Sequence, residues 1–381
     1  MFDSILNQGE MMNFEFSEEQ NMLREQAQGF LADNCPPAVV RRVLEGEAEY
    51  DAELWRKIAE MGWTATVIPE EYGGLGLSYL ELCVIAEELG RVVAPVPFSS
   101  SVYHATEALL LAGSDAQKEA WLPKLAAGEA IGTLAMAEGA GRPMAKSLEC
   151  EVTDGRLSGK KIPVPDAGIA DVAIVLAKSG RRASLYLVEM DQGSKVAVKP
   201  VPTLDPSRGH GEIRFRKAKA ELLGRAGKGM ELLDVLLDRA AVLYAWEQVG
   251  GSQAALEQAK AYAMERFAFG RPIGSYQAIK HKLAHMYVKN TLARSNCYFG
   301  AWALNTDADE LALAAATARV SAIQAYYYAS KENIQTHGGM GYTWEFDCQF
   351  FYRRAKALSV AIGSEAFWQE RLMDAYEENA A

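Results

Sequence analysis

The sequence predicts an α+β protein with three successive domains: a helical domain, a middle antiparallel β domain and a closing four-helix bundle. Its 381 residues exceed the size of a usual single domain. Along the chain, apolar residues first recur at helical spacing, then alternate in short runs, and then return to helical spacing over longer stretches. We place the domains at residues 13–130, 131–225 and 226–379.

The first domain contains helices with recognisable ends. The stretch SEEQNMLREQAQGFLADNC opens with Ser17, followed closely by Gln20, which predicts a capped helix start. DAELWRKIAEMGW repeats the helical spacing up to Gly62, and DAQKEAWLPKLAAGEA predicts another helix that stops at Gly128.

The middle domain consists of short β-rich runs, among them IGTLAMAE, VAIVLAKSG, RASLYLVEM and GEIRFRKAKA. D-G and S-G dipeptides between such runs are typical of tight turns. We therefore expect antiparallel strands that form a small barrel or sandwich.

The last domain is richer in Ala and Leu. ELLDVLLDRAAVLYAWEQVGGSQAALEQAKAYAMERFAF predicts one long helix, in which Gly250 and Gly251 permit another helix to approach closely. Two further long helical stretches follow, so we expect a four-helix bundle. Apolar residues on more than one face of these helices predict burial against a partner subunit.

Composition excludes several classes of function. The net charge of −11 argues against a nucleic-acid or anionic-membrane partner, and no apolar run is long enough to predict a membrane span. The five cysteines are scattered without a CxxC pair, which predicts reduced thiols and no metal site. Because the N-terminus shows no basic and apolar leader, we expect a cytoplasmic protein.

Three motifs occur far apart and in a fixed order: PEEYGGLGLSYLELCVIAEELGR, ERFAFGRPIGSYQ and IQTHGGMGYTWEFDCQFFYRRAK. Together with the domain order they resemble the acyl-CoA dehydrogenase family over nearly the whole chain. The resemblance implies FAD as cofactor, an acyl-CoA thioester as substrate and an electron-transfer flavoprotein as electron acceptor. It also implies α,β-dehydrogenation, in which a carboxylate removes the α proton while a hydride moves from the β carbon to FAD.

The usual catalytic bases of that family are absent. In the R-x-A-K-x-x-x-x-Y-E-G-T segment of the family, the Glu position holds Ile362. In members that carry the Glu on the first bundle helix, counting back from Arg266 without a gap gives Ala240. An aliphatic side chain cannot accept a proton. Asp238, two residues away, is a weak candidate and is better interpreted as a CoA contact or a helix ion pair.

The segments that hold the flavin ring in the family also differ here. The family motif T-E-P-x-x-G-S-D reads AEGAGRPM, so Glu138 remains but the Thr and Ser hydroxyls are lost. The family motif W-I-T-N is replaced by a stretch that reads KIPVPD, whose two prolines remove backbone donors.

By contrast, the residues that reach into a neighbour's FAD site in the family are present. The resemblance assigns contacts with the FAD to Arg266, Phe269, Gln277, Gln335, Gly338, Gly339 and, at the Thr position of Y-E-G-T, Ser364. A guanidinium complements a pyrophosphate, and glycines let backbone N–H groups approach it closely.

This combination resembles the base-lacking subunit of bacterial heterotetrameric acyl-CoA dehydrogenases that act on steroid CoA thioesters. We therefore expect a partner subunit that completes the FAD site of a homologous chain, in a hetero- or homotetramer. Two alternatives stay open: an active homo-oligomeric dehydrogenase with an unassigned base, and a non-redox acyl-CoA binding or scaffold protein. For single residues, Arg266 could be a solvated surface residue, Gly338 a helix cap and Glu247 a satisfied bundle carboxylate.

Overall fold

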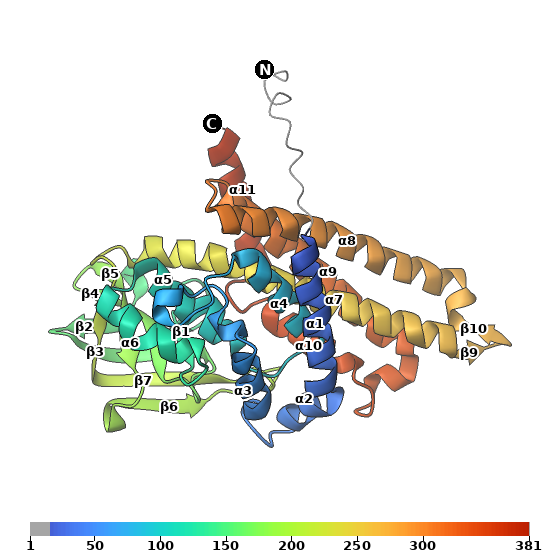
Figure 1. The fold of residues 1–381 in the computed structure, drawn as a ribbon, viewed down its shortest axis with the longest axis horizontal. Helices are drawn as coiled ribbons and strands as arrows, with labels where there is room; N and C mark the ends of the chain where they lie inside the picture. Colours follow the sequence, from blue (N-terminus) through green and yellow to red (C-terminus); the bar gives the residue numbers. More distant parts are fainter. Residues whose placement is uncertain (1–15, 381) are drawn as a thin grey trace.

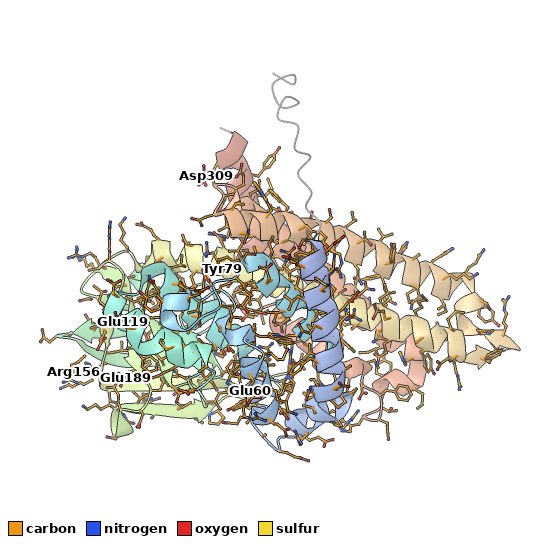
Figure 2. The ribbon with its side chains drawn as sticks, viewed as in Figure 1. Glu60, Tyr79, Glu119, Arg156, Glu189 and Asp309 are labelled. Carbon is orange, nitrogen blue, oxygen red and sulfur yellow. The ribbon has the colours of Figure 1, made fainter. Side chains whose placement is uncertain are left out.

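The computed structural model describes residues 16–380, so residues 13–15 of the predicted first domain lie outside the described part. Figure 1 shows the sheet at one end of the molecule, the N-terminal helices beside it, and long helices that extend to the opposite end. The predicted succession of helical, β and helical parts is confirmed. Charged side chains such as Glu60, Glu119, Arg156 and Asp309 cover the outside (Figure 2).

The N-terminal part begins with the predicted capped helix. The Ser17 side chain accepts a hydrogen bond from the Gln20 backbone, and the Gln20 side chain accepts one from the Ser17 backbone. Helices end ahead of Gly62 and Gly128, both of which have positive φ. The helical segments are α1 (Glu18–Asn34), α2 (Pro37–Leu44), α3 (Ala52–Glu60), η1 (Trp63–Ala65), η2 (Glu70–Tyr72), α4 (Tyr79–Arg91), the π-helix η3 (Ser99–Thr106), α5 (Glu107–Ala112) and α6 (Asp115–Ala126).

The middle part is an eight-stranded sheet in the order β6-β7-β3-β2-β4-β5-β8, with β1 paired to β4. The strands are β1 (Gly132–Ala135), β2 (Glu151–Thr153), β3 (Arg156–Pro165), β4 (Val172–Ser179), β5 (Arg182–Glu189), β6 (Val196–Pro200), β7 (His210–Lys219) and β8 (Glu221–Leu223), with short helices η4 (Ala145–Ser147) and η5 (Gly193–Lys195). Hairpin neighbours pair antiparallel as predicted, but β1 and β2 run parallel to β4. Parallel pairs need a longer crossover than a hairpin turn, and the tight-turn signals of the sequence do not reveal such a crossover.

The C-terminal part confirms one very long helix, α7 (Gly229–Glu265), with 37 residues. This helix ends four residues earlier than the predicted stretch, because the chain turns into a small hairpin, β9 (Phe267–Ala268) and β10 (Arg271–Pro272). The remaining segments are η6 (Ile273–Ser275), α8 (Gln277–Thr306), α9 (Leu311–His337), η7 (Gly338–Tyr342), α10 (Cys348–Leu358) and α11 (Glu365–Ala380). No helix within residues 16–380 combines the length and the apolar character needed to cross a bilayer.

Helices α4 and α7 cross with their backbones in contact. A Cβ atom added to Gly250 would lie 1.9 Å from the carbonyl oxygen of Glu87, and one added to Gly90 would lie 1.9 Å from that of Glu247. Gly251 faces the ring of Tyr326 in the same helix layer. The close helix–helix approach predicted at the Gly250–Gly251 pair is therefore present. It brings the first domain into direct contact with the bundle.

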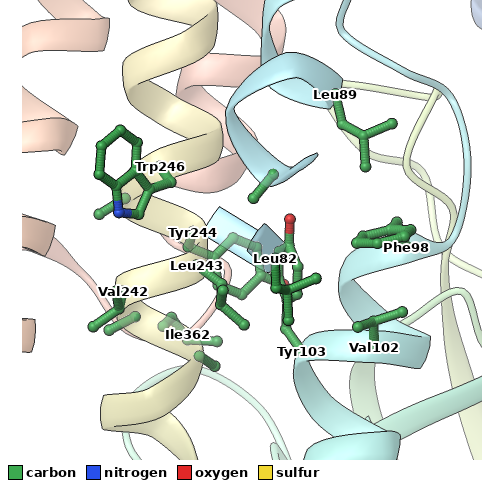
Figure 3. Close-up of a cluster of buried hydrophobic side chains, with 14 of the residues drawn as sticks. Leu82, Leu89, Phe98, Val102, Tyr103, Val242, Leu243, Tyr244, Trp246 and Ile362 are labelled. Atoms are coloured by element: carbon green, nitrogen blue, oxygen red, sulfur yellow. The ribbon is translucent and has the colours of Figure 1, made fainter. Parts of the chain in front are cut away.

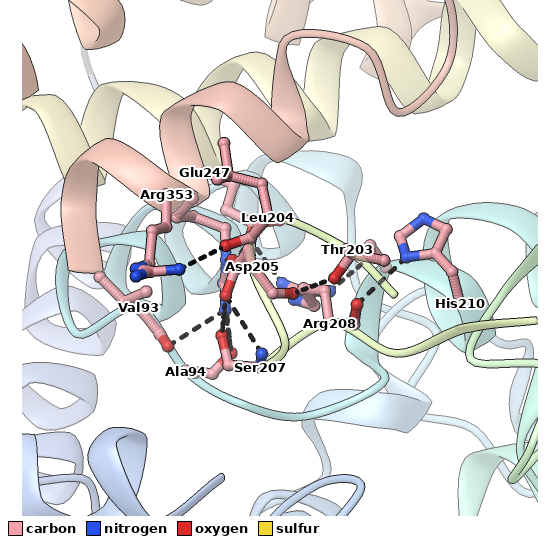
Figure 4. A network of polar contacts seen from close by, with 12 residues as sticks. Val93, Ala94, Thr203, Leu204, Asp205, Ser207, Arg208, His210, Glu247 and Arg353 are labelled. Carbon is pink, nitrogen blue, oxygen red and sulfur yellow. Dashed lines mark hydrogen bonds and ion pairs between the residues drawn. The ribbon is translucent and has the colours of Figure 1, made fainter. Parts of the chain in front are cut away.

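A buried ionic network joins all three parts of the chain (Figure 4). Arg354 of α10 donates to the Asp205 carboxylate at 2.6 Å, to Glu247 of α7 at 3.4 Å and to the carbonyl oxygen of Ala94 at 3.3 Å. Arg208, next to β7, donates to the same Glu247 oxygen at 2.5 Å. Because Arg354 is fully buried, the network fixes how the sheet, the first helices and the bundle sit together.

Candidate functional site

The two residues that the sequence predicts at the base positions lie inside the apolar core. Ala240 is on α7 and Ile362 follows α10, and both side chains are buried. Figure 3 shows Ile362 beside Val242 and Leu243, in the cluster that also contains Leu82. Neither residue has a group that can accept a proton, so this part of the core carries no base at these positions.

Asp238 is engaged by an arginine. Arg371 of α11 donates to both of its carboxylate oxygens, with 2.5 Å between Nε and Oδ1. Burial raises the pKa of Asp238, and the contact with Arg371 opposes this shift. Two residues along a helix correspond to a rotation of about 200°. Asp238 therefore points to the face of α7 opposite Ala240, where it ties α11 to α7.

Glu247 is the other interior carboxylate of α7. Its Oε1 accepts from Arg208 and Arg354 in the three-part network, whereas no partner within residues 16–380 contacts its Oε2. Seven residues separate Glu247 from Ala240, which is about 10 Å along the helix. Its distance from Ala240 and its ion pairs indicate that Glu247 has a structural role.

The segments that correspond to the flavin-ring motifs are held by internal contacts. Glu138 accepts from Lys161 Nζ at 2.7 Å and from the backbone N–H groups of Glu149 and Cys150 at 2.6 and 3.0 Å. Burial favours the neutral acid, but Lys161 and the backbone donors outweigh it and lower the pKa of Glu138. Arg142 forms an ion pair with Asp234 of α7. Glu138 and Arg142 thus already have partners inside the chain.

The far end of the bundle is different, because several of its exposed polar side chains have no partner within residues 16–380. Phe269, at the tip of the β9–β10 hairpin, is 97% exposed and has a φ of 51°. The side chain of the exposed Arg266 makes no hydrogen bond or ion pair with any residue in the described range. Gln277, the first residue of α8, is exposed as well. The hairpin is firmly held, since Tyr276 donates to the Ala268 carbonyl at 2.9 Å.

A second exposed segment lies at the same end, where α9 finishes. Gln335 is exposed, and Gly338 and Gly339 follow it in the turn. The His337 ring stacks on Tyr262, one turn before Arg266, with 4.2 Å between ring centroids. The structure therefore brings the Arg266 segment and the Gln335 segment together at one end of the bundle.

Glycine stands at the two positions of this turn for different reasons. Gly338 has a φ of 61°, which a residue with a side chain rarely adopts. Gly339 has no such φ, and nothing lies within 4 Å of the place where its Cβ would be. Neither backbone strain nor packing in this chain therefore requires a glycine at 339. An approaching ligand or partner would require one.

Ser364 has a structural role in this chain. Its Oγ accepts a hydrogen bond from the backbone N–H of Phe367 at 3.2 Å, which caps the start of α11. It follows Ile362 by two residues, and α11 lies away from the β9–β10 hairpin (Figure 1).

The sequence motifs gave no sign of one further group of residues. The π-helix η3 buries Tyr103 and His104 against α7, and several of their polar atoms lack a partner within residues 16–380. The run Ser99-Ser100-Ser101 is the one local signal of unusual backbone there. Among the described residues, no group of three or more His, Cys, Asp or Glu side chains could hold a metal ion.

The fold defines a class of flavin-linked dehydrogenases built from a helical, a β and a helical domain. The chain matches the acyl-CoA dehydrogenase N-terminal domain over residues 17–129 and the acyl-CoA dehydrogenase C-terminal domain over residues 227–375. It therefore belongs to the acyl-CoA dehydrogenase family, whose members are FAD-dependent oxidoreductases.

Individual relatives and solved structures match this chain over almost its full length. The chain is 33% identical over 350 residues to acyl-CoA dehydrogenase IpdE2 of Mycobacterium tuberculosis, covering 91% of this chain and 94% of that protein. The ChsE4-ChsE5 complex from Mycobacterium tuberculosis matches with a TM-score of 0.87 at 26% identity, over 96% of this chain and 99% of that chain. The Tcur3481-Tcur3483 steroid ACAD matches with a TM-score of 0.86 at 28% identity, over 95% and 99%.

FAD fits the two halves of the candidate site unequally. At the bundle end, a free guanidinium and an open glycine turn suit the phosphates of a dinucleotide. In the segments that the sequence predicts beside the flavin ring, Glu138 and Arg142 already form ion pairs. The hydroxyl residues of the family motif are replaced there by other residues.

Proposed function

We propose that this chain is a subunit of an acyl-CoA dehydrogenase that completes the FAD site of a homologous neighbour and does not itself remove the substrate proton. The observation that carries the proposal is the contrast between the buried core around Ala240 and Ile362 and the exposed far end of the bundle. Ile362 and Ala240 put buried aliphatic groups at the base positions. The side chains of Arg266, Phe269 and Gln335 are exposed and have no partner within residues 16–380.

In this function the exposed end of the bundle binds the FAD of the neighbouring subunit and orients it. FAD, when bound, supplies the acceptor for the hydride that leaves the β carbon of the thioester. The Arg266 guanidinium would pair with the pyrophosphate as a charge-assisted hydrogen-bond donor, and the turn at Gly338 and Gly339 would bring backbone N–H groups to the same region. Phe269 would give up its exposed apolar surface to the neighbouring subunit.

The proton-removing carboxylate then belongs to the neighbour. The ChsE4-ChsE5 complex, which contains a chain similar in structure to this one, is built from two different chains. This supports a partner subunit that differs from this chain. We extend the proposal to a tetramer of homologous subunits. We also extend it to an acyl-CoA thioester of the steroid type, because the Tcur3481-Tcur3483 steroid ACAD is among the similar structures. An electron-transfer flavoprotein is the proposed electron acceptor.

The test is co-expression with a homologous chain that carries the Glu. We expect the chain purified alone to be flavin-poor, and the complex to contain about one FAD for each pair of subunits and to reduce an artificial acceptor with acyl-CoA. Arg266→Ala in the complex should lower FAD content at least tenfold, because a desolvated charge pair is lost. The matched control is Arg181→Ala, which removes an exposed arginine of the β domain.

Two results would overturn the proposal. One is a yellow homo-oligomer that is fully active alone and loses its activity in Asp238→Asn, which would identify Asp238 as the base. The other is acyl-CoA binding without flavin in any complex, which would indicate a non-redox binding protein.

A further inference from the structure

Helix α2 of the first domain contacts the loop that leads into α10 (Figure 1). The Arg41 guanidinium of α2 donates to the carbonyl oxygen of Trp344 and, at 2.5 Å, to the Asp347 carboxylate. It also lies 3.5 Å from the carbonyl oxygen of Glu345. Arg41 and Trp344 are 303 residues apart in the sequence, so one side chain joins two distant parts of the chain.

Aromatic rings surround the same guanidinium. The Cζ atom of Arg41 lies 5.4 Å from the ring centroid of Trp344 and 5.1 Å from that of Phe350, which suits a cation–π contact. The indole N–H of Trp344 donates at 2.7 Å to Glu45, the residue that caps the end of α2. A lysine carries a compact charge without the planar fork of an arginine, so it could not make all of these contacts at once.

The same loop supports the two exposed segments at the end of the bundle. Phe346, within this loop, packs against the rings of His337 and Tyr262, with 5.6 and 6.3 Å between ring centroids. His337 is the last residue of α9 and directly precedes Gly338. The carbonyl oxygen of Tyr262 accepts from the backbone N–H of Arg266 at 2.9 Å. A continuous series of contacts therefore runs from α2 to both segments.

The glycine turn depends on the residues that flank it. No atom of the described residues lies within 4 Å of the place where a Cβ of Gly339 would be, so the turn has no packing of its own there. On its C-terminal side, the backbone N–H and the hydroxyl of Thr343 donate to the Met340 carbonyl at 3.1 and 2.9 Å. The turn is thus held by α9 before it and by the loop bound to Arg41 after it.

We propose that Arg41 is a positioning residue for the FAD of the neighbouring subunit, because it holds the loop that orients Arg266 and the turn at Gly338 and Gly339. The inference rests on the proposed function. It adds the first domain of this chain to the parts on which the neighbour's flavin depends. A turn that is ordered in advance loses less conformational freedom when FAD binds, so the affinity for FAD is higher.

The first measurement is the affinity for FAD of the complex between the full chain and the homologous chain that carries the Glu. We expect FAD titrated into the flavin-free complex to bind about tenfold more weakly in Arg41→Met and about threefold more weakly in Arg41→Lys, because the turn is then ordered only on binding. Arg42→Met is the matched control. Arg42 is the next residue of α2 and pairs with Asp51 of the first domain, so its removal should leave the affinity unchanged.

The second measurement needs no flavin. Hydrogen exchange followed by mass spectrometry, on the full chain alone, should be faster within residues 338–347 of Arg41→Met than in the wild type or in Arg42→Met. Exchange in α7 and α8 should stay the same. This pattern distinguishes a loosened loop from a misfolded chain, in which exchange would rise throughout.

Equal affinities for FAD in Arg41→Met and the wild type would overturn the inference, because the turn would then keep its position without α2. Unchanged exchange within residues 338–347 would overturn it as well. Faster exchange throughout the Arg41→Met chain would assign Arg41 to overall stability and also contradict it. If Arg266→Ala lowers FAD content and Arg41→Met does not change the affinity, this inference alone fails; if neither variant has an effect, the proposed function fails too.

Discussion

Glu88 is a carboxylate that the fold buries beside a second one, Glu87, on α4. Its side chain accepts from Gln28 at 3.1 Å and lies 3.3 Å from Arg91 Nε. Burial, and then the charge of Glu87, raise the pKa of Glu88 to about 7, against the lowering effect of Arg91. At neutral pH this carboxyl is therefore close to its midpoint of titration.

A pH-dependent contribution to stability follows. The folded chain holds the Glu88 proton up to about pH 7, whereas the unfolded chain loses it near 4.5. Between these values the folded state binds more protons, so stability decreases as pH rises. We expect Glu88→Gln to gain stability relative to the wild type between pH 5 and pH 8, by roughly 2–3 kcal/mol. Urea unfolding at both pH values measures this gain.

The exposed Glu119→Gln is the control, and its difference from the wild type should not vary with pH in that range. If the two variants show the same pH dependence, Glu88 is ionised throughout in the folded chain.

At this scale the sequence predictions rest on counted offsets. Ile362 is assigned by its place in the segment that follows Lys356, and Ala240 by counting back from Arg266, and both assignments stay predictions. The partners of Asp238 and Glu247 could not be predicted, because Arg371, Arg208 and Arg354 come from distant segments whose meeting depends on domain packing. His104, whose ring nitrogens have no hydrogen-bond partner within residues 16–380, belongs to no motif, and a sequence does not display its burial.

Among the elements, the long helix α7 was predictable because its apolar spacing and its glycine pair are local signals. The π-helix was not, since its hydrogen-bond pattern is stabilised by tertiary packing on α7 and β1. The parallel pairing of β1 with β4 was also missed, because pairing between strands distant in sequence leaves no turn signal.

The crossing of α4 and α7 gives a prediction at the scale of elements. Gly250→Ala puts a methyl group against the Glu87 carbonyl, and backbone cannot move aside as a side chain can. We expect a loss of about 2–4 kcal/mol in the free energy of unfolding. Gly29→Ala on α1 is the matched control: nothing lies within 4 Å of its added methyl, and it should gain roughly 0.5–1 kcal/mol from helix propensity. Equal effects at both sites would show that the helices separate freely.

For the whole molecule, the core decides how the domains behave together. One buried apolar cluster contains Leu31 of α1, Leu176 of β4 and Trp246 of α7, so the three parts share a core. The buried network around Arg354 adds a polar connection among the same three parts. We therefore expect the chain to unfold in one cooperative transition and to present the bundle end as part of a rigid frame.

Two adjacent arginines test this connection. Arg354→Met removes a fully buried guanidinium that joins Asp205, Glu247 and the first domain. It leaves the Asp205 carboxylate without its ion-pair partner, while Glu247 keeps Arg208. The free energy of unfolding should fall by about 3–5 kcal/mol. Arg353→Met removes a half-buried neighbour that donates to the Leu204 carbonyl at 2.9 Å, and should cost about 1 kcal/mol. Urea unfolding followed by tryptophan fluorescence and by far-ultraviolet circular dichroism should show one shared transition, shifted far more in Arg354→Met. Similar shifts in the two variants would mean that the apolar core joins the domains without help from the network. Separate transitions for the two signals in the wild type would mean that the domains unfold independently.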